Sequence, residues 1–324
     1  MTLTENKLLA SGSQKNSRDL RIVFMGTPEF AVASLDALVQ AGFNVVGVIT
    51  APDKPAGRGL QLQQSAVKQH AVSKNLLILQ PPKLKDLQFL EALKSLHADL
   101  QIVVAFRMLP EVVWAMPPLG TINVHGSLLP QYRGAAPINW AVINGERETG
   151  VTTFKLQHQI DTGNILLQEK ISIGESETAG SLHDHMKAVG AELLVKTINE
   201  LAAGTLPEKP QQASAAAIKH APKLTTETSQ IDWTKSVQTV YNLIRGLSPY
   251  PAAFTELEGK KLKLFLVEKE MQTPAEAPGA FASDKKTFLK FACPDGYIVV
   301  NELQLEGKKR LPISDFLRGY RFAE

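Results

Sequence analysis

A strand–helix–strand pattern near the start of the chain constrains the fold more than any other feature. Residues 20–25 (LRIVFM) form an apolar run interrupted only by Arg21, which is typical of a parallel strand buried on both faces. After Gly26-Thr27-Pro28, apolar side chains recur at helical spacing up to Gly42, and residues 44–50 (NVVGVIT) form a second apolar run. A β-α-β unit of this kind requires a parallel sheet with a right-handed crossover.

Two further apolar runs extend the pattern, at residues 100–106 (LQIVVAF) and 120–125 (GTINVH), and residues 84–96 have helical spacing. The first part of the chain is therefore predicted to be an α/β domain with a doubly wound, mostly parallel, Rossmann-like sheet. Ligands of such sheets bind beyond the carboxyl ends of the strands. Neither G-x-G-x-x-G nor G-x-x-x-x-G-K-[ST] is present, which disfavours dinucleotide-binding and P-loop chemistry.

The last third of the chain has a different pattern. A long helix is expected over residues 181–203, followed by a segment rich in Pro, Gln and Ala and then by a short amphipathic helix. The strands expected after that helix are residues 253–257, 261–267, 288–292 and 297–305, and Asp295-Gly296 is a hairpin signal. Short strands after a helix predict a small β-rich barrel.

These patterns predict four segments. A flexible N-terminal extension (1–19) precedes a catalytic domain (20–206), and a linker (207–223) leads to a β-rich domain (224–324).

Composition excludes several classes of protein. Cys293 is the only cysteine among the 324 residues, so an intrachain disulfide or a cysteine-based metal cluster is impossible and a reducing cytoplasm is expected. No apolar run approaches the roughly 18–20 residues that a membrane span needs. His183 and His185 are two residues apart on an expected helix, so their side chains point in different directions and cannot bind one metal ion together. We expect a monomer that binds neither a metal nor a membrane.

The net charge of +3 is unevenly distributed. Residues 1–206 contain 18 Lys and Arg and 18 Asp and Glu, whereas residues 207–324 contain 17 and 14. Lysine and arginine also cluster there, at Lys260, Lys261 and Lys263 and at Lys308, Lys309 and Arg310. An anionic partner such as nucleic acid explains this excess, and so does a solvated surface.

The strongest candidates for chemistry end the fourth expected strand. Asn123 and His125 are two residues apart, so both side chains project from the same face near the carboxyl end of the strand. An amide and an imidazole aimed into one cleft can polarise a carbonyl and transfer a proton. The alternative is a hydrogen-bonded pair with only a structural role.

Two loops carry further candidates. Asp161 lies in a turn between the strand-like residues 151–156 and 165–173, where it either bonds its own backbone or orients a histidine. The Pro- and Gly-rich loop 52–59 carries Lys54 and Arg58, two cations suited to phosphate contact, although such a pattern is also common in ordinary loops.

Taken together, these motifs resemble the 10-formyltetrahydrofolate-dependent formyltransferases. The matching segments are Asn123-x-His125, Ser127-Leu128-Leu129-Pro130, Arg133-Gly134-Ala135-Ala136-Pro137 and Asp161-Thr162-Gly163. The resemblance covers roughly residues 20–320, and the loop 52–59 and the segment Gly307-Lys308-Lys309-Arg310 favour the branch of the family that acts on initiator tRNA.

The resemblance implies a reaction. The α-amine of methionine esterified to initiator tRNA would attack the formyl carbon of 10-formyltetrahydrofolate, giving N-formylmethionyl-tRNA for translation initiation. Asn123 and His125 would stabilise the oxyanion, and Asp161 would orient His125 or a bound water and assist proton transfer. One such donor is worth about 3–4 kcal/mol.

The resemblance also implies how the substrates bind. Residues Ser127, Leu128, Leu129 and Pro130 would line the folate site. Lys54 and Arg58 would contact the tRNA acceptor end, and Lys308, Lys309 and Arg310 would bind the tRNA backbone from an OB-like barrel, a fold often used on nucleic acids.

The chain departs from the family pattern at three places. Phe106-Arg107 stands where Tyr-Gly is common, Lys54 stands where Arg is frequent, and the residues around Asp161 differ, with Asn164 in place of Asp. Two other functions are compatible with the motifs. One is formylation of a small amine, either an amino-sugar nucleotide or glycinamide ribonucleotide; the other is a non-catalytic RNA-binding module, against which the intact Asn-His-Asp set argues.

Overall fold

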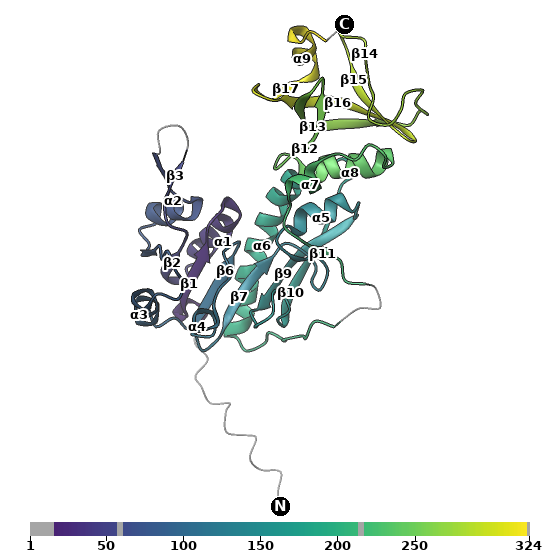
Figure 1. Ribbon diagram of the computed structural model, residues 1–324. Coiled ribbons are helices and arrows are strands. Elements are labelled where there is room, and N and C mark those ends of the chain that lie inside the picture. The colour runs from purple at the N-terminus through teal and green to yellow at the C-terminus, as the bar shows by residue number, and fades with distance from the viewer. Residues whose placement is uncertain (1–15, 57–60, 213–216, 323–324) are drawn as a thin grey trace, which may run out of the picture. The chain divides into compact units, whose positions relative to one another are not determined.

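The computed structural model describes residues 16–56, 61–212 and 217–322 (Figure 1). The chain divides into two compact units. The first comprises Met1–His125, Val151–Glu169 and Lys187–Gln212, and the second comprises Gly126–Gly150, Lys170–Met186 and Ala213–Glu324. Most of the expected N-terminal extension, residues 1–15, lies outside the described residues. A short 3₁₀ helix, Ser17–Asp19, precedes the first strand.

A seven-stranded sheet, in the order β10-β9-β7-β6-β1-β2-β5, forms the centre of the first part of the chain. Its strands are β1 (Arg21–Gly26), β2 (Asn44–Ile49), β5 (Ile78–Leu79), β6 (Leu100–Val104), β7 (Thr121–His125), β9 (Glu148–Lys155) and β10 (Ile165–Ser172). Its helices are α1 (Glu29–Gln40), α2 (Ala66–Ser73), α3 (Leu87–Ser95), α4 (Glu111–Trp114) and α6 (Ala179–Ala202). Strands β5, β2, β1, β6 and β7 pair in parallel, so the predicted mostly parallel, Rossmann-like sheet is confirmed.

The first β-α-β unit forms for the reasons that the sequence pattern indicates. Every residue of β1 after Arg21 is buried, and parallel strands pair with β1 on both sides. Helix α1 buries Leu35 and Leu38 completely. Gly26 ends β1 where a Cβ would lie 2.6 Å from the Cβ of Ala31 and 3.1 Å from the carbonyl oxygen of Val104, so only glycine permits this close turn into the helix.

Strand β9 changes the direction of the sheet. It pairs antiparallel with β7, and His125 at the end of β7 lies opposite Thr152. The patterns at residues 151–156 and 165–173 predict strands, but they do not indicate this antiparallel pairing. The pairing places the turn that follows β9 beside the strands that carry the site.

The second unit contains an antiparallel curled sheet in the order β12-β13-β16-β15-β14, with β17 paired to β16. Its strands are β12 (Ala253–Leu257), β13 (Lys260–Glu270), β14 (Phe281–Ser283), β15 (Leu289–Cys293), β16 (Gly296–Leu305) and β17 (Leu311–Pro312). The shorter elements of this unit are β8 (Arg133–Gly134), α5 (Pro137–Ile143), β11 (His220–Ala221), α7 (Thr226–Ser229) and α9 (Ile313–Gly319). The predicted β-rich C-terminal fold is confirmed.

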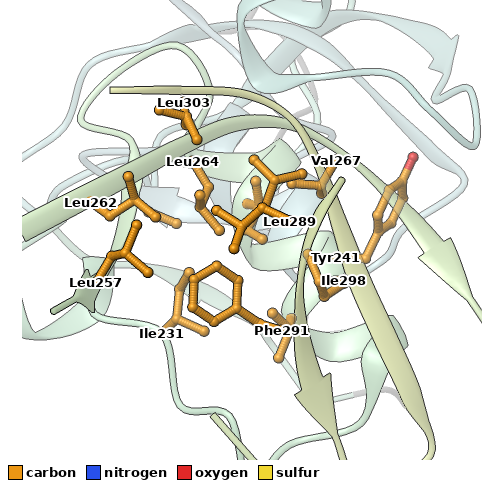
Figure 2. Packing of buried hydrophobic residues seen from close by; sticks show 14 of the residues in the cluster. Ile231, Tyr241, Leu257, Leu262, Leu264, Val267, Leu289, Phe291, Ile298 and Leu303 are labelled. Carbon is orange, nitrogen blue, oxygen red and sulfur yellow. The ribbon is translucent and has the colours of Figure 1, made fainter. Parts of the chain in front are cut away.

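Helix α8 (Val237–Leu247) supplies one side of the core of this sheet (Figure 2). Its apolar face carries Val237, Val240, Tyr241, Ile244 and Leu247, all of which are buried. The helix begins at a defined point, because Asp295 Oδ1 accepts a hydrogen bond of 2.7 Å from the backbone N–H of Val237. Within the described residues, no helix is long and apolar enough to cross a membrane.

Candidate active site

Strand β7 presents Asn123 and His125 near its carboxyl end. Asn123 lies opposite Phe154 and His125 opposite Thr152 in the pairing with β9, which fixes both side chains in register on one face. His125 is only 7 % exposed, and its ring meets the Phe154 ring edge-on with 6.4 Å between centroids. The imidazole is therefore held by packing, whereas Asn123 is partly exposed. The structure places both residues where the sheet is expected to bind its ligand.

The turn after β9 brings Asp161 to His125. Asp161 Oδ2 lies 3.9 Å from His125 Nδ1, and the two side chains are 12 % and 8 % exposed. This distance is longer than a hydrogen bond, but it places the carboxylate beside the imidazole, where both side chains are shielded from solvent. The sequence could not decide whether Asp161 reaches His125, and the structure shows that it does.

Steric constraints on the backbone explain why the turn has the sequence Asp-Thr-Gly. Asp161 adopts a left-handed backbone conformation, with φ of 54°. Gly163 passes so close to β9 that a Cβ on it would lie 1.6 Å from the carbonyl oxygen of Lys155. The backbone N–H of Lys155 in turn donates to the carbonyl of Asn164 at 3.0 Å. A glycine two residues after Asp161 is what lets the turn lie against the strand.

The expected folate-lining segment follows His125 directly in the chain and belongs to the second unit. Ser127 and Leu129 are buried, whereas Leu128 and Pro130 are partly exposed. The Ser127 hydroxyl donates to the carbonyl of Gln131 at 2.6 Å, so it closes its own loop. Leu128 and Pro130 keep apolar surface that a ligand ring can cover.

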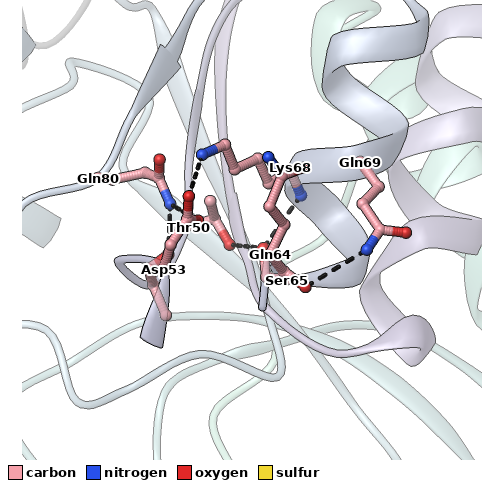
Figure 3. A network of polar contacts seen from close by, with 8 residues as sticks. Thr50, Asp53, Gln64, Ser65, Lys68, Gln69 and Gln80 are labelled. Atoms are coloured by element: carbon pink, nitrogen blue, oxygen red, sulfur yellow. Dashed lines mark hydrogen bonds and ion pairs between the residues drawn. The ribbon is translucent and has the colours of Figure 1, made fainter. Parts of the chain in front are cut away.

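The loop that carries Lys54 is held at its base by a polar network (Figure 3). Strands β3 (Lys54–Ala56) and β4 (Gln61–Gln63) form a two-stranded hairpin with Lys54 exposed. Asp53, at the foot of the hairpin, pairs with Lys68 at 2.5 Å and accepts from the Gln80 amide at 2.8 Å. These two bonds hold the pKa of Asp53 below its ordinary value. Arg58, expected to contact tRNA, lies outside the described residues.

The basic residues of the second unit are exposed but not equally available. Lys308 and Lys309 lie in the turn between β16 and β17. Arg310 is ion-paired with Glu302, and its guanidinium stacks 4.2 Å from the centroid of the Phe265 ring. Lys308 and Lys309 are thus better placed than Arg310 to bind an anionic backbone.

The environment of Cys293 does not favour nucleophilic chemistry. Burial, together with the charge of Asp295, raises the pKa of the Cys293 thiol to about 12, and the side chain packs in the core of the second unit. In the parts of the chain that the structure describes, no cluster of three or more His, Cys, Asp or Glu is arranged to hold a metal ion.

Sequence reasoning missed the residues that support these groups from a distance. Lys68 and Gln80 fix the base of the hairpin, and Gln211 donates to the backbone of the Asp161 turn. None of the three lies in a motif, and each is separated from its partner by at least 15 residues. No local pattern signals such contacts.

Solved structures show the class of fold. The structure of HypX from Aquifex aeolicus in complex with tetrahydrofolic acid is similar with a TM-score of 0.64 at 19 % identity, over 94 % of this chain and 48 % of that chain. An N-formyltransferase from Helicobacter canadensis, solved with folinic acid and dTDP-3-aminofucose, is similar with a TM-score of 0.65 at 19 % identity, over 87 % of this chain and 98 % of that chain. At this identity the likeness establishes the fold alone.

Sequence comparison establishes the family. The formyl transferase family matches residues 20–198, and the formyl transferase C-terminal domain matches residues 223–321. The chain belongs to the formyl transferase family, as the resemblance predicted. Proteins named methionyl-tRNA formyltransferase are similar to it: that of Bacteroides fragilis is 54 % identical over 94 % of this chain and 97 % of its own length, and that of Parabacteroides distasonis is 56 % identical over 94 % and 96 %.

Proposed function

We propose that this enzyme transfers the formyl group of 10-formyltetrahydrofolate to the α-amine of methionine on initiator tRNA. The observation that carries the proposal is the identity of 54–56 % with methionyl-tRNA formyltransferases over 94 % of the chain. The His125–Asp161 arrangement at the end of β7 is the chemical feature that supports it.

Asn123 and His125 act on the formyl oxygen. When the amine attacks the formyl carbon, a new C–N bond forms and the carbonyl oxygen takes up negative charge. An amide N–H of Asn123 and an imidazole N–H of His125 can donate to that oxygen, and each such donor lowers the barrier by about 3–4 kcal/mol. The bond between the formyl carbon and the folate nitrogen then breaks.

Asp161 supports the proton transfers. The attacking amine loses a proton and the departing folate nitrogen gains one, so a group that holds a proton between the two events is needed. With Asp161 Oδ2 at 3.9 Å from Nδ1, the carboxylate orients the His125 ring or a bound water and assists the transfer of the proton.

The formyl donor, a folate, binds to partly apolar surface, whereas the acceptor, a tRNA, binds to basic surface. Ser127, Leu128, Leu129 and Pro130 line the folate site, with Leu128 and Pro130 offering apolar surface. Lys54 and Arg58 contact the acceptor end of the tRNA, while Lys308, Lys309 and Arg310 bind its phosphates. The catalytic domain at 20–206, the linker at 207–223 and the tRNA-binding domain at 224–324 stay a prediction from the sequence. We infer a cytoplasmic monomer.

A panel of acceptors tests the proposal. Purified protein is incubated with 10-formyltetrahydrofolate and, in separate reactions, with methionyl initiator tRNA, an amino-sugar nucleotide or glycinamide ribonucleotide. Formylation of the methionyl-tRNA alone is expected. Formylation of a small amine with none of the methionyl-tRNA would support the alternative acceptor, and no formylation of any acceptor would support the non-catalytic RNA-binding module.

A further inference from the structure

The backbone of the Asp161 turn is tied to a residue 50 positions further along the chain. The side-chain amide of Gln211 donates two hydrogen bonds, one to the carbonyl of Asp161 and one to the carbonyl of Gly163, both at 2.9 Å. An amide group has two N–H donors, and here each of them satisfies one carbonyl. Gln211 therefore joins both ends of the three-residue Asp-Thr-Gly turn.

Residues next to Gln211 bind the residues that flank this turn. Lys209 and Ile165 exchange two backbone hydrogen bonds of 2.8 and 2.9 Å. Glu208 is ion-paired with Lys155 and accepts from the Asn164 amide at 3.3 Å. Asn164 thereby suits this chain, because an aspartate there would place two carboxylates together. Residues 208–211, which the sequence assigns to a linker, form a clamp on the turn.

The turn needs such support. A non-glycine residue with φ of 54° is held in a sparsely populated region, and it persists there only where the surroundings compensate for the strain. Asp161 also acts on His125 across 3.9 Å, where a small displacement changes the interaction. Gly163 rests on β9 at one side of the turn. Residues 208–211 hold the turn in place from the segment that follows α6.

We propose that Gln211 is a positioning residue that sets the Asp161 carboxylate against His125. This inference rests on the proposed function, because it assigns Asp161 a part in the reaction. The side-chain amide of Gln211 donates to backbone carbonyls of the turn. It acts on turnover only through the backbone of Asp161 and Gly163.

A double-mutant cycle separates positioning from a merely structural role. Gln211→Met keeps the length of the side chain and removes both donors, and the exposed neighbour gives the matched control, Gln212→Met. We expect Gln211→Met to lower kcat about tenfold, with the KM for both substrates unchanged. In an Asp161→Asn background the same substitution should cause no further loss, since the group that it positions is already gone.

Each outcome has a separate meaning. If Asp161→Asn alone left kcat unchanged, the catalytic assignment of the proposed function would fail. If Asp161→Asn lowered kcat while Gln211→Met had no effect, or an equal effect in both backgrounds, only the positioning role would be wrong.

A second variant, Gln211→Glu, gives a pH signature. An ionised carboxylate has no donor and repels both carbonyls, whereas a protonated one donates one hydrogen bond. The kcat of Gln211→Glu relative to that of Gln211→Met should therefore rise as the pH falls. A ratio that does not change with pH would contradict the hydrogen-bonding role.

Discussion

Substituting Gly163 with alanine tests whether the close approach of the turn to β9 sets the geometry of the site. The new Cβ would lie 1.6 Å from the carbonyl oxygen of Lys155, and such contacts are essentially never shorter than 3.0 Å. The turn and the strand must therefore separate by about 1.4 Å at this point. Both groups are backbone, so no side chain can rotate away.

That displacement acts on Asp161, two residues earlier. A misplacement of about 1 Å at a reacting group can cost on the order of 10²-fold in rate, equivalent to about 2.7 kcal/mol. We expect Gly163→Ala to lower kcat for formyl transfer by about that factor, with a decrease of about 1–3 kcal/mol in the free energy of unfolding. Formyl-methionyl-tRNA formation at saturating substrate measures kcat, and urea titration measures stability.

Gly319→Ala is the control, because a Cβ at Gly319 in α9 would meet nothing within 4 Å. It should leave both quantities close to those of the unsubstituted protein. If Gly163→Ala retained normal kcat, the position of Asp161 would not limit the reaction, and the steric argument for the Asp-Thr-Gly turn would be refuted.

Three further predictions concern residues outside the turn. Because Lys68 holds the pKa of Asp53 below its ordinary value, this ion pair is complete at neutral pH and is lost only as the pH falls through that lowered pKa. Asp53→Asn should therefore raise the KM for tRNA at pH 7 without changing kcat. An unchanged KM would show that the base of the hairpin does not contribute to tRNA binding. Replacing Lys308 and Lys309 with alanine should lower the slope of log Kd for tRNA against log salt concentration by about 1–2, whereas an identical slope would place the phosphate contacts elsewhere. With its pKa near 12, Cys293 should resist iodoacetamide in the folded protein at pH 7.5, and rapid labelling measured by mass spectrometry would contradict its burial.

Much of the architecture follows from local pattern. The amphipathic spacing predicts the helix observed at Val237–Leu247, and the run 253–257 matches β12 in both its limits. Mostly apolar runs predict β1 and β2, because the buried parts of a parallel strand need apolar side chains on both faces. Each of these patterns lies within a single helix or strand, so it can be read from the sequence of that segment alone.

The parts of the site that a sequence does not display are those made by distant segments. The Asn123 and His125 pair was visible because both lie on one strand, and Asp161 was visible because of the Asp-Thr-Gly motif. The contact between His125 and Asp161 depends on the antiparallel pairing of β7 with β9, which no alternation of residues predicts. Gln211 reaches the turn from a segment whose Pro, Gln and Ala composition indicates only a linker.

The Asn-His-Asp set of β7 and the turn after β9 is proposed to transfer a formyl group to methionyl-tRNA. The most direct test is a single-turnover measurement with protein in excess of methionyl initiator tRNA and saturating 10-formyltetrahydrofolate, comparing the unsubstituted protein with His125→Ala. We expect a loss of at least about a hundredfold in the rate of formyl transfer, with tRNA binding intact. An unchanged rate would show that His125 takes no part in formyl transfer.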